Sequence, residues 1–134
     1  MITVSTDIAA PLSKVWDMWT KAEHITNWNF ASPEWHCPSA INDLQPGGRF
    51  SWRMEAKDGS MGFDFEGTYD EVMEYERISY ILGDGRKVMI TINATDGGVQ
   101  LTETFEAEKI NSEELQQAGW QAILNNFKKY VESS

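Results

Sequence analysis

The chain has 134 residues, and 21 acidic against 11 basic side chains give it a formal net charge of -10. This charge repels nucleic-acid phosphates and anionic membrane surfaces, so nucleic acid is not expected as a partner. The length predicts a single domain spanning residues 1–134, large enough to bury a core without help from a metal or a disulfide. One cysteine, Cys37, and two histidines offer neither an internal disulfide nor a metal constellation. We therefore expect no metal, no cofactor and a reducing, cytoplasmic setting.

The amino terminus predicts a strand with one buried face. Ile2, Val4, Thr6 and Ile8 alternate with polar side chains, which is the period of a half-buried strand. The segment lacks the basic start and apolar stretch of a signal peptide, and no apolar run approaches the roughly 18 residues of a membrane span. A soluble protein with no membrane insertion is expected.

Two short helices are predicted next. Pro11 stands where a helix can begin, because the N–H that proline lacks would have no partner there. Apolar residues then recur at helical spacing, and a second short piece carries Ile25 toward Trp28; the first helix presents Leu12, Val15, Trp16 and Trp19.

From Trp35 the pattern becomes that of an antiparallel sheet. Glycine turns punctuate strand-like runs in the manner of hairpins, at 46–48, 58–59, 84–85 and 96–98. The runs alternate apolar and polar residues, so one face of the sheet is expected to be aromatic and the other to face solvent. Counting the first strand, seven strands are predicted.

Residues 111–134 predict one long closing helix. Asn111 is expected to cap it, with Glu114 reaching back as in a capping box. Its apolar side chains fall on one arc of roughly 120°, which also contains Gln116; the arc comprises Trp120, Ile123, Leu124, Phe127, Tyr130 and Val131. Because a lone helix over a large sheet leaves space beneath it, the chain predicts a cavity.

Several motifs, spread over nearly the whole chain, carry a resemblance to a known family. They are Ala10-Pro11-x-x-x-Val15-Trp16-x-x-Trp19-Thr20 with Trp28, Leu44-Gln45-Pro46-Gly47-Gly48-Arg49-Phe50, Gly67-Thr68-Tyr69-Asp70-Glu71-Val72, Arg77-Ile78-Ser79-Tyr80, Thr104-Phe105-Glu106 and Gln117-Ala118-Gly119-Trp120-x-x-x-Leu124-x-x-Phe127. With these, the chain resembles the START-like or birch-pollen-allergen-like (SRPBCC) superfamily. More narrowly, it resembles stand-alone, bacterial-type members of the family named after activators of a heat-shock chaperone's ATPase.

The resemblance implies an α+β helix-grip fold, in which a curved antiparallel sheet of about seven strands wraps a long C-terminal helix. Two short helices lie between the first and second strands of such a fold. The fold hosts lipid carriers, cyclases, hydrolases, stress proteins and co-chaperone domains, so function has to be argued from the site. Co-chaperone activators need an additional amino-terminal chaperone-binding domain, which we do not expect here.

The candidate ligand-binding residues are the aromatic side chains of the predicted inner face, together with adaptable methionines and the facing residues of the closing helix. They are Trp35, Trp52, Met54, Phe63, Phe65, Tyr69, Tyr80, Met89, Gln116, Trp120, Ile123 and Phe127. The alternative for each is that it simply fills the core.

Two residues are candidates for catalysis. Glu103 points inward if Val99, Leu101 and Phe105 do, and a carboxylate there would need a partner or a raised pKa, as general acids and bases have. Alternatively, the opposite face of the strand points inward, or Glu103 pairs with an arginine at a wet rim. His36 is the other candidate, although its neighbour Cys37 points to the opposite face of a strand.

Three functions remain open at this stage. The first is binding of a small hydrophobic or amphipathic molecule between sheet and closing helix. The second is a cyclase, dehydratase or hydrolase-like activity in the same cavity, in which Glu103 or His36 moves a proton. The third is a co-chaperone or stress-response module that uses an exposed apolar patch outside the cavity. A homodimer is a further possibility.

Overall fold

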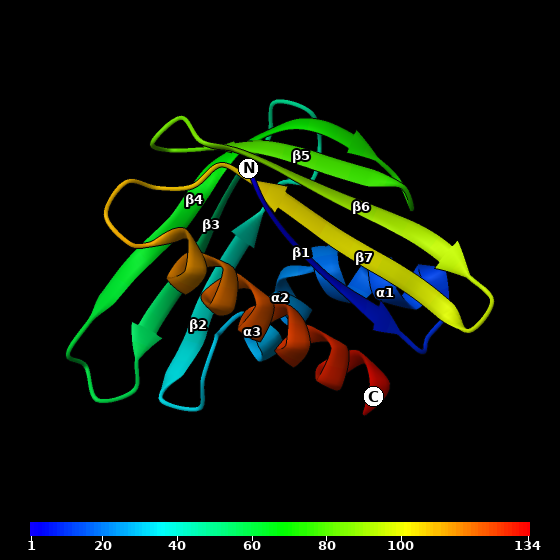
Figure 1. The fold of residues 1–134 in the computed structure, drawn as a ribbon, viewed down its shortest axis with the longest axis horizontal. Coiled ribbons are helices and arrows are strands. Elements are labelled where there is room, and N and C mark those ends of the chain that lie inside the picture. The colour runs from blue at the N-terminus through cyan, green and yellow to red at the C-terminus, as the bar shows by residue number, and fades with distance from the viewer.

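A seven-stranded antiparallel sheet forms the larger part of the structure, a computed structural model that describes residues 1–134. The strand order is β1-β7-β6-β5-β4-β3-β2 (Figure 1). Strands β2 to β6 therefore each pair with the next strand along the chain, and β1 pairs with β7. The strands are β1 Ile2–Ile8, β2 Trp35–Asn42, β3 Arg49–Ala56, β4 Gly62–Met73, β5 Arg77–Leu82, β6 Lys87–Thr95 and β7 Gly98–Phe105. The seven predicted strands are confirmed.

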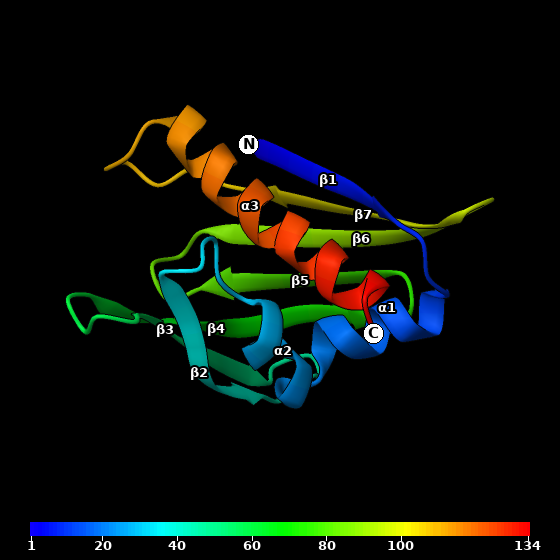
Figure 2. The same ribbon diagram turned by 90° about the horizontal axis from the view of Figure 1, so that it is seen from below.

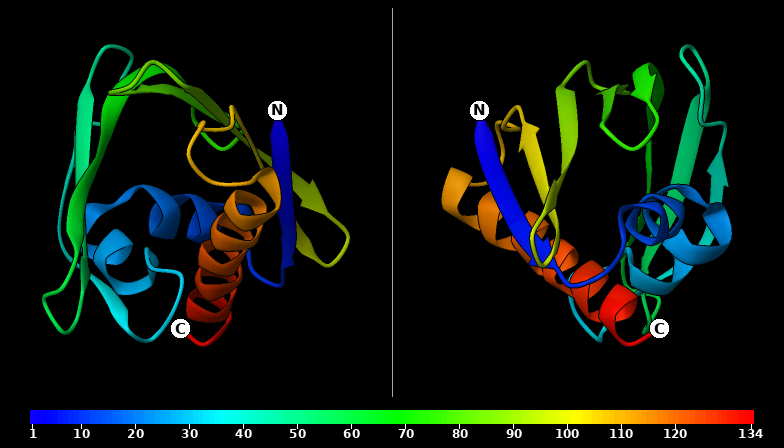
Figure 3. Two further views of the ribbon diagram at one scale, coloured as in Figure 1. Left: turned by 60° about the vertical axis from the view of Figure 1, so that its left-hand side comes forward. Right: turned by 90° about the vertical axis from the view of Figure 1, so that its right-hand side faces the viewer.

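Three helices lie on the concave side of this sheet. The two short helices, α1 Leu12–Thr20 and α2 Ala22–Trp28, are separated by Lys21 in an extended conformation, and α3 Glu113–Glu132 closes the chain. Figure 2 shows α3 running obliquely beneath the sheet, with α1 and α2 beside its C-terminal end. Seen from the ends, the sheet arches over all three helices (Figure 3). The predicted α+β helix-grip arrangement is confirmed.

Glycines at the predicted turns have the backbone conformation that a tight turn requires. Gly47, Gly59 and Gly85 all have φ between 78° and 91°, where a side chain would clash with the backbone. The turn between β4 and β5 contains no glycine, and Tyr75 has a φ of 67° there. Its ring packs edge-on against Trp16 at a centroid distance of 5.8 Å.

The start of α3 corrects one prediction. Ser112, rather than Asn111, is the N-cap, and its hydroxyl accepts a hydrogen bond from Leu115 N at 3.1 Å. Asn111 instead donates from its side chain and its backbone to the carboxylate of Glu108. The serine lies one residue nearer the helix, where the geometry suits a cap.

The polar face of α3 covers the exposed edge of β1. Gln117 and Gln121 donate to the carbonyl oxygens of Thr3 and Ser5, and Lys128 donates to that of Asp7. An edge strand otherwise presents unpaired backbone groups to other chains, so these contacts protect the sheet margin. They also fix the distance between α3 and the sheet.

The two halves of α3 have different surroundings. In the C-terminal half, Leu124, Phe127 and Val131 are fully buried, and the Phe127 ring lies within 5 Å of both Trp19 and Trp28. Toward the middle of the helix, Trp120 and Ile123 are only partly buried. The core is therefore filled at one end of the helix and hollow at the other.

No helix has the length and apolar character needed to cross a membrane.

Candidate functional site

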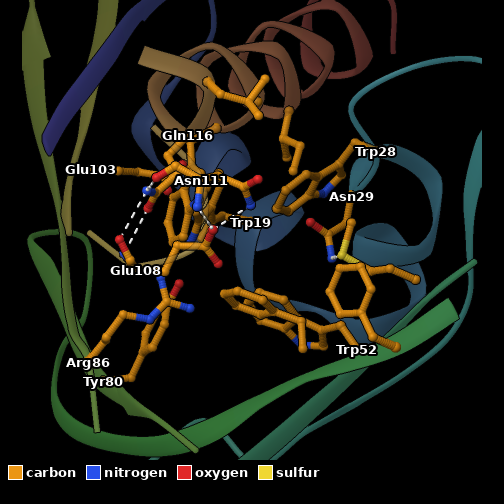
Figure 4. A pocket seen from close by; sticks show the side chains of 17 residues that line it. Trp19, Trp28, Asn29, Trp52, Tyr80, Arg86, Glu103, Glu108, Asn111 and Gln116 are labelled. Carbon is orange, nitrogen blue, oxygen red and sulfur yellow. Dashed lines mark hydrogen bonds between the residues drawn. The ribbon is translucent and has the colours of Figure 1, made fainter. Parts of the chain in front are cut away.

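A cavity of about 280 Å³ lies between the N-terminal half of α3 and the concave face of the sheet. Figure 4 shows its side chains converging from the sheet, from α3 and from the two short helices. They are Trp19, Trp28, Asn29, Trp52, Met54, Phe63, Phe65, Tyr80, Arg86, Glu103, Glu108, Asn111, Leu115, Gln116, Gly119, Trp120 and Ile123.

Aromatic rings in mutual contact form the walls. Trp52 stacks on Phe65 with centroids 5.6 Å apart, and Phe65 meets Trp120 edge-on at 5.9 Å. Trp120 in turn stacks on Phe105 at 3.8 Å, which holds its indole against the sheet. Such ring pairs add stabilisation beyond area burial. The walls are therefore preorganised by contacts between the rings.

Glu103 places a carboxyl group on this apolar wall. It lies on the inner face of β7, paired in register with Val4 of β1 and Ile90 of β6, and only 4% of the residue is exposed. It forms no ion pair and no hydrogen bond with another residue, and desolvation by burial raises its pKa to about 8. At neutral pH the carboxyl is mainly protonated, so it can both donate and accept a hydrogen bond in the cavity.

Two further lining residues, Tyr80 and Trp52, carry polar groups. Tyr80 lines the cavity from β5; burial raises the pKa of its phenol, and the nearby Glu103 raises it further. Nε1 of Trp52 is buried and donates to no protein atom. A buried donor without an acceptor is unusual in folded proteins.

A short segment after β7 forms one side of the entrance and is tied to α3 by Gln116. The Gln116 side chain accepts from Glu108 N at 2.8 Å and donates to Asn111 O at 2.8 Å. Across the entrance, Arg86 in the β5–β6 turn pairs with Asp84 at 2.7 Å. The amide of Gln116, the polar exception in the apolar arc, thus holds the entrance loop in place.

Comparison with known proteins decides the family. The family model described as "Activator of Hsp90 ATPase homolog 1-like protein" (AHSA1) matches residues 9–132, nearly the whole chain. The chain belongs to this AHSA1-like family. No functionally curated protein matches it.

Solved structures support the assignment. An AHSA1-like protein from Aeromonas hydrophila is 44% identical, with a TM-score of 0.93, and the match covers 98% of this chain and 92% of that one. Chr148 from Cytophaga hutchinsonii is 52% identical, with a TM-score of 0.85 and the same coverage of both chains. NE0264 from Nitrosomonas europaea is 20% identical, with a TM-score of 0.84 over 98% of this chain and 94% of that one, which shows a shared fold alone.

Most of the predicted ligand-binding residues line the cavity of this AHSA1-like chain. They come from three strands and from α3, and comprise Trp52, Met54, Phe63, Phe65, Tyr80, Gln116, Trp120 and Ile123. The catalytic candidate Glu103 also lines the cavity, from β7. The inward parity of Glu103 is confirmed. Neither the opposite-face alternative nor an arginine partner applies to it.

Four of the predicted ligand-binding residues lie outside the cavity. Phe127 is fully buried in the filled end of the core, and Tyr69 donates its hydroxyl to Asn42 within the aromatic cluster. Met89 is 41% exposed on the outer face, because its neighbours on β6 point inward. Trp35 is half-buried near Phe63, with ring centroids 6.1 Å apart, and does not reach the lining.

His36, the second catalytic candidate, lies on the outer face of the sheet. Its Nε2 is 3.6 Å from Oε1 of Glu55, a residue that alternates with the inward-facing Met54. The imidazole is 41% exposed. It therefore cannot share the cavity with Glu103 as an acid–base partner.

Gly119 on α3 borders open space. A Cβ built at this position meets no atom within 4 Å, and the residue lines the cavity. The glycine thus widens the cavity, since any larger side chain would project toward it.

The remaining lining residues were not predicted from the sequence. Trp19 and Trp28 follow the helical apolar pattern, which predicts burial in the core and does not distinguish a cavity wall. Asn29 is the residue at which α2 ends. The rest, Arg86, Glu108, Asn111 and Leu115, are in turns or at the first turn of α3. No periodicity places loop residues relative to a cavity, so only the fold could reveal them.

Proposed function

We propose that this AHSA1-like protein binds a small hydrophobic or amphipathic molecule in the cavity between the sheet and α3. The observation that carries the proposal is the combination of apolar aromatic walls with the unpartnered carboxyl group of Glu103 inside. Ligand pockets typically have this composition, with mostly apolar walls and a few polar groups that orient the ligand. The family fold commonly binds hydrophobic ligands.

The cavity volume limits the ligand. At about 280 Å³ it lies near the lower end of the range for small-molecule pockets. A long acyl chain or a large fused-ring system does not fit without movement of α3. The hydrogen bonds from α3 to β1 oppose such movement. A flat molecule of one to a few rings is the size class that the walls favour.

Filling the cavity from Gly119 tests the proposal. Gly119→Leu adds a side chain toward the cavity, whereas Ala118→Leu adds one at the neighbouring exposed position as a matched control. N-phenylnaphthylamine, a neutral apolar fluorophore, is expected to bind the wild type in a one-to-one complex. Gly119→Leu should weaken this binding at least about tenfold by steric exclusion, and Ala118→Leu should not. Equal binding by all three proteins would place the ligand elsewhere.

Identification of a natural ligand is the complementary measurement. Native mass spectrometry of the freshly purified wild type and of Gly119→Leu should show a co-purified molecule in the first and a reduced amount in the second. Retention of the same molecule by both would argue against the cavity as its site.

A proton-transfer enzyme is the second candidate, and Glu103 is the observation that favours it. A carboxyl whose pKa is raised to about 8 in an apolar cavity has the properties of a general acid or base. Deuterium exchange next to the carbonyl of small aromatic ketones, followed by NMR, would reveal such chemistry. Glu103→Gln should abolish exchange while leaving ketone affinity near normal. Exchange that persists unchanged in Glu103→Gln would exclude this role.

A further inference from the structure

The charges at the cavity and its entrance are predominantly of one sign. Arg86 is the single basic residue that lines the cavity, and it already pairs with Asp84 at 2.7 Å. A surface groove shares the entrance residues Phe63, Phe65, Arg86, Glu108 and Asn111 with the cavity. The groove also carries Asp64, Glu66 and Asp84, so four carboxylates accompany one arginine there.

A further carboxyl group, that of Glu103, lies inside the cavity. Only 4% of the surface of Glu103 is exposed, and the residue has no partner among the other residues of the chain. Its carboxyl group points into the cavity. A carboxyl kept without a partner in an apolar wall is costly in its ionised form unless a ligand compensates it. This observation is independent of the carboxylates at the entrance.

We propose that the ligand of this cavity is a cationic amphiphile, with a protonated amine that pairs with Glu103 and a flat apolar body held by the aromatic walls. The inference rests on the proposed binding function and specifies its chemical class.

The aromatic walls also favour a cation. The faces of Trp52, Phe65, Tyr80 and Trp120 bear the negative part of the ring quadrupole, which attracts an ammonium group placed over them. An anionic ligand meets the opposite situation, because no unpaired basic side chain lines the cavity. The entrance carboxylates attract cations from solution and repel anions.

Binding of an amine to Glu103 is linked to pH. Other titratable residues that line the cavity are Tyr80 on β5, Arg86 in the β5–β6 turn and Glu108 after β7. The flanking strands present Val4 and Ile90 to Glu103, and the helices present Trp19, Trp28, Asn29, Gln116 and Trp120 around the cavity. In the free protein, burial holds the pKa of Glu103 at about 8. The amine therefore displaces a proton from Glu103 below that pH, and its affinity should rise toward about pH 8.5.

Three probes with one apolar body and different head groups test the inference by calorimetry. Naphthylmethylamine is cationic, naphthylmethanol is neutral and naphthylacetate is anionic. At about pH 8.5 the amine should bind at least about tenfold more tightly than the alcohol, and the acetate should bind most weakly. At about pH 6.5 the preference for the amine should shrink, with about one proton released per amine bound.

Two variants complete the experiment. Glu103→Gln should reduce the affinity for the amine to that for the alcohol and remove its pH dependence. Glu74→Gln, the same charge change on the exposed β4–β5 turn, should leave both affinities as in the wild type. If the alcohol binds as tightly as the amine, or if Glu103→Gln retains the amine preference, the cationic class is wrong and the binding function stands. If none of the probes binds, the cavity proposal fails together with this inference.

Discussion

At the scale of single residues, Glu103 is the most informative side chain. Its strand neighbours Val4 and Ile90 are almost completely buried, so a leucine or valine would fit the surrounding pattern and would stabilise the sheet. The chain instead has an ionisable group there, without a partner. Functional sites are where stability is commonly exchanged for chemistry, which supports the proposed functional role of this position.

The first prediction concerns Glu103 and stability. The pKa of its carboxyl is about 8 in the folded protein and about 4.3 in an unfolded chain, so the folded state binds the proton more tightly. Protonation of Glu103 therefore stabilises the folded state by a few kcal/mol. This stabilisation is fully present below about pH 4 and is lost as the pH rises through about 8. Glu103→Gln removes this loss, so it should be more stable relative to wild type at about pH 8.5 than at about pH 5.

Urea unfolding of both proteins at several pH values measures this difference. Glu74→Gln serves as the control, because Glu74 is exposed and its substitution should produce no such trend. A constant difference between wild type and Glu103→Gln across the pH range would show that the buried carboxyl does not titrate with a raised pKa.

Sequence periodicity placed some residues correctly and not others. The alternation of Val99, Leu101 and Phe105 was sufficient to direct Glu103 inward, and the structure confirms it. The same alternation on β6 directs Met89 outward, away from the other ligand-binding candidates. The lack of a partner for Glu103 could not be predicted, because it depends on side chains from strands far apart in the sequence.

At the scale of elements, one apolar face of α3 has two structural roles: one part of it fills the core and the other borders the cavity. The face itself was predicted by helical periodicity, and its buried residues follow that arc. Periodicity gives the direction of each side chain around the helix and not the distance to the sheet at each turn. That distance depends on sheet curvature and on the contacts of α3 with β1. The separation into a filled half and a hollow half was therefore visible only in the structure.

The second prediction contrasts two residues of this face. Phe127→Ala removes a fully buried ring from between Trp19 and Trp28, and should lower the free energy of unfolding by about 3–5 kcal/mol. Ile123→Ala removes a side chain that already borders the cavity, so the loss should be about 1 kcal/mol.

Binding and unfolding measurements on the two variants are complementary. Ile123→Ala should change the affinity for N-phenylnaphthylamine, whereas Phe127→Ala should affect mainly stability. Comparable losses of stability in the two variants would mean that the N-terminal half of α3 is packed as tightly as the C-terminal half.

At the scale of the whole molecule, the fold could be predicted because each level of the sequence agrees with it. Glycine turns define consecutive hairpins, and alternation gives each strand one apolar face. The entrance could not be predicted in this way. It forms where the β5–β6 turn, the loop between β7 and α3 and strand β4 approach one another, and its acidic character arises from residues such as Asp64, Asp84 and Glu108 that no motif connects.

The acidic surplus of the entire chain leads to the last prediction. With a net charge of -10 at neutral pH, the folded state contains unfavourable repulsion between carboxylates that salt screens. Raising sodium chloride from about 0.02 M to about 0.5 M at pH 7 should therefore increase the free energy of unfolding by about 1 kcal/mol. The sequence pI is about 4.5, and near this pH the net charge and the salt effect should both become small. Urea unfolding at the two pH values checks this, because a salt effect of equal size at both would have to arise from something other than net charge.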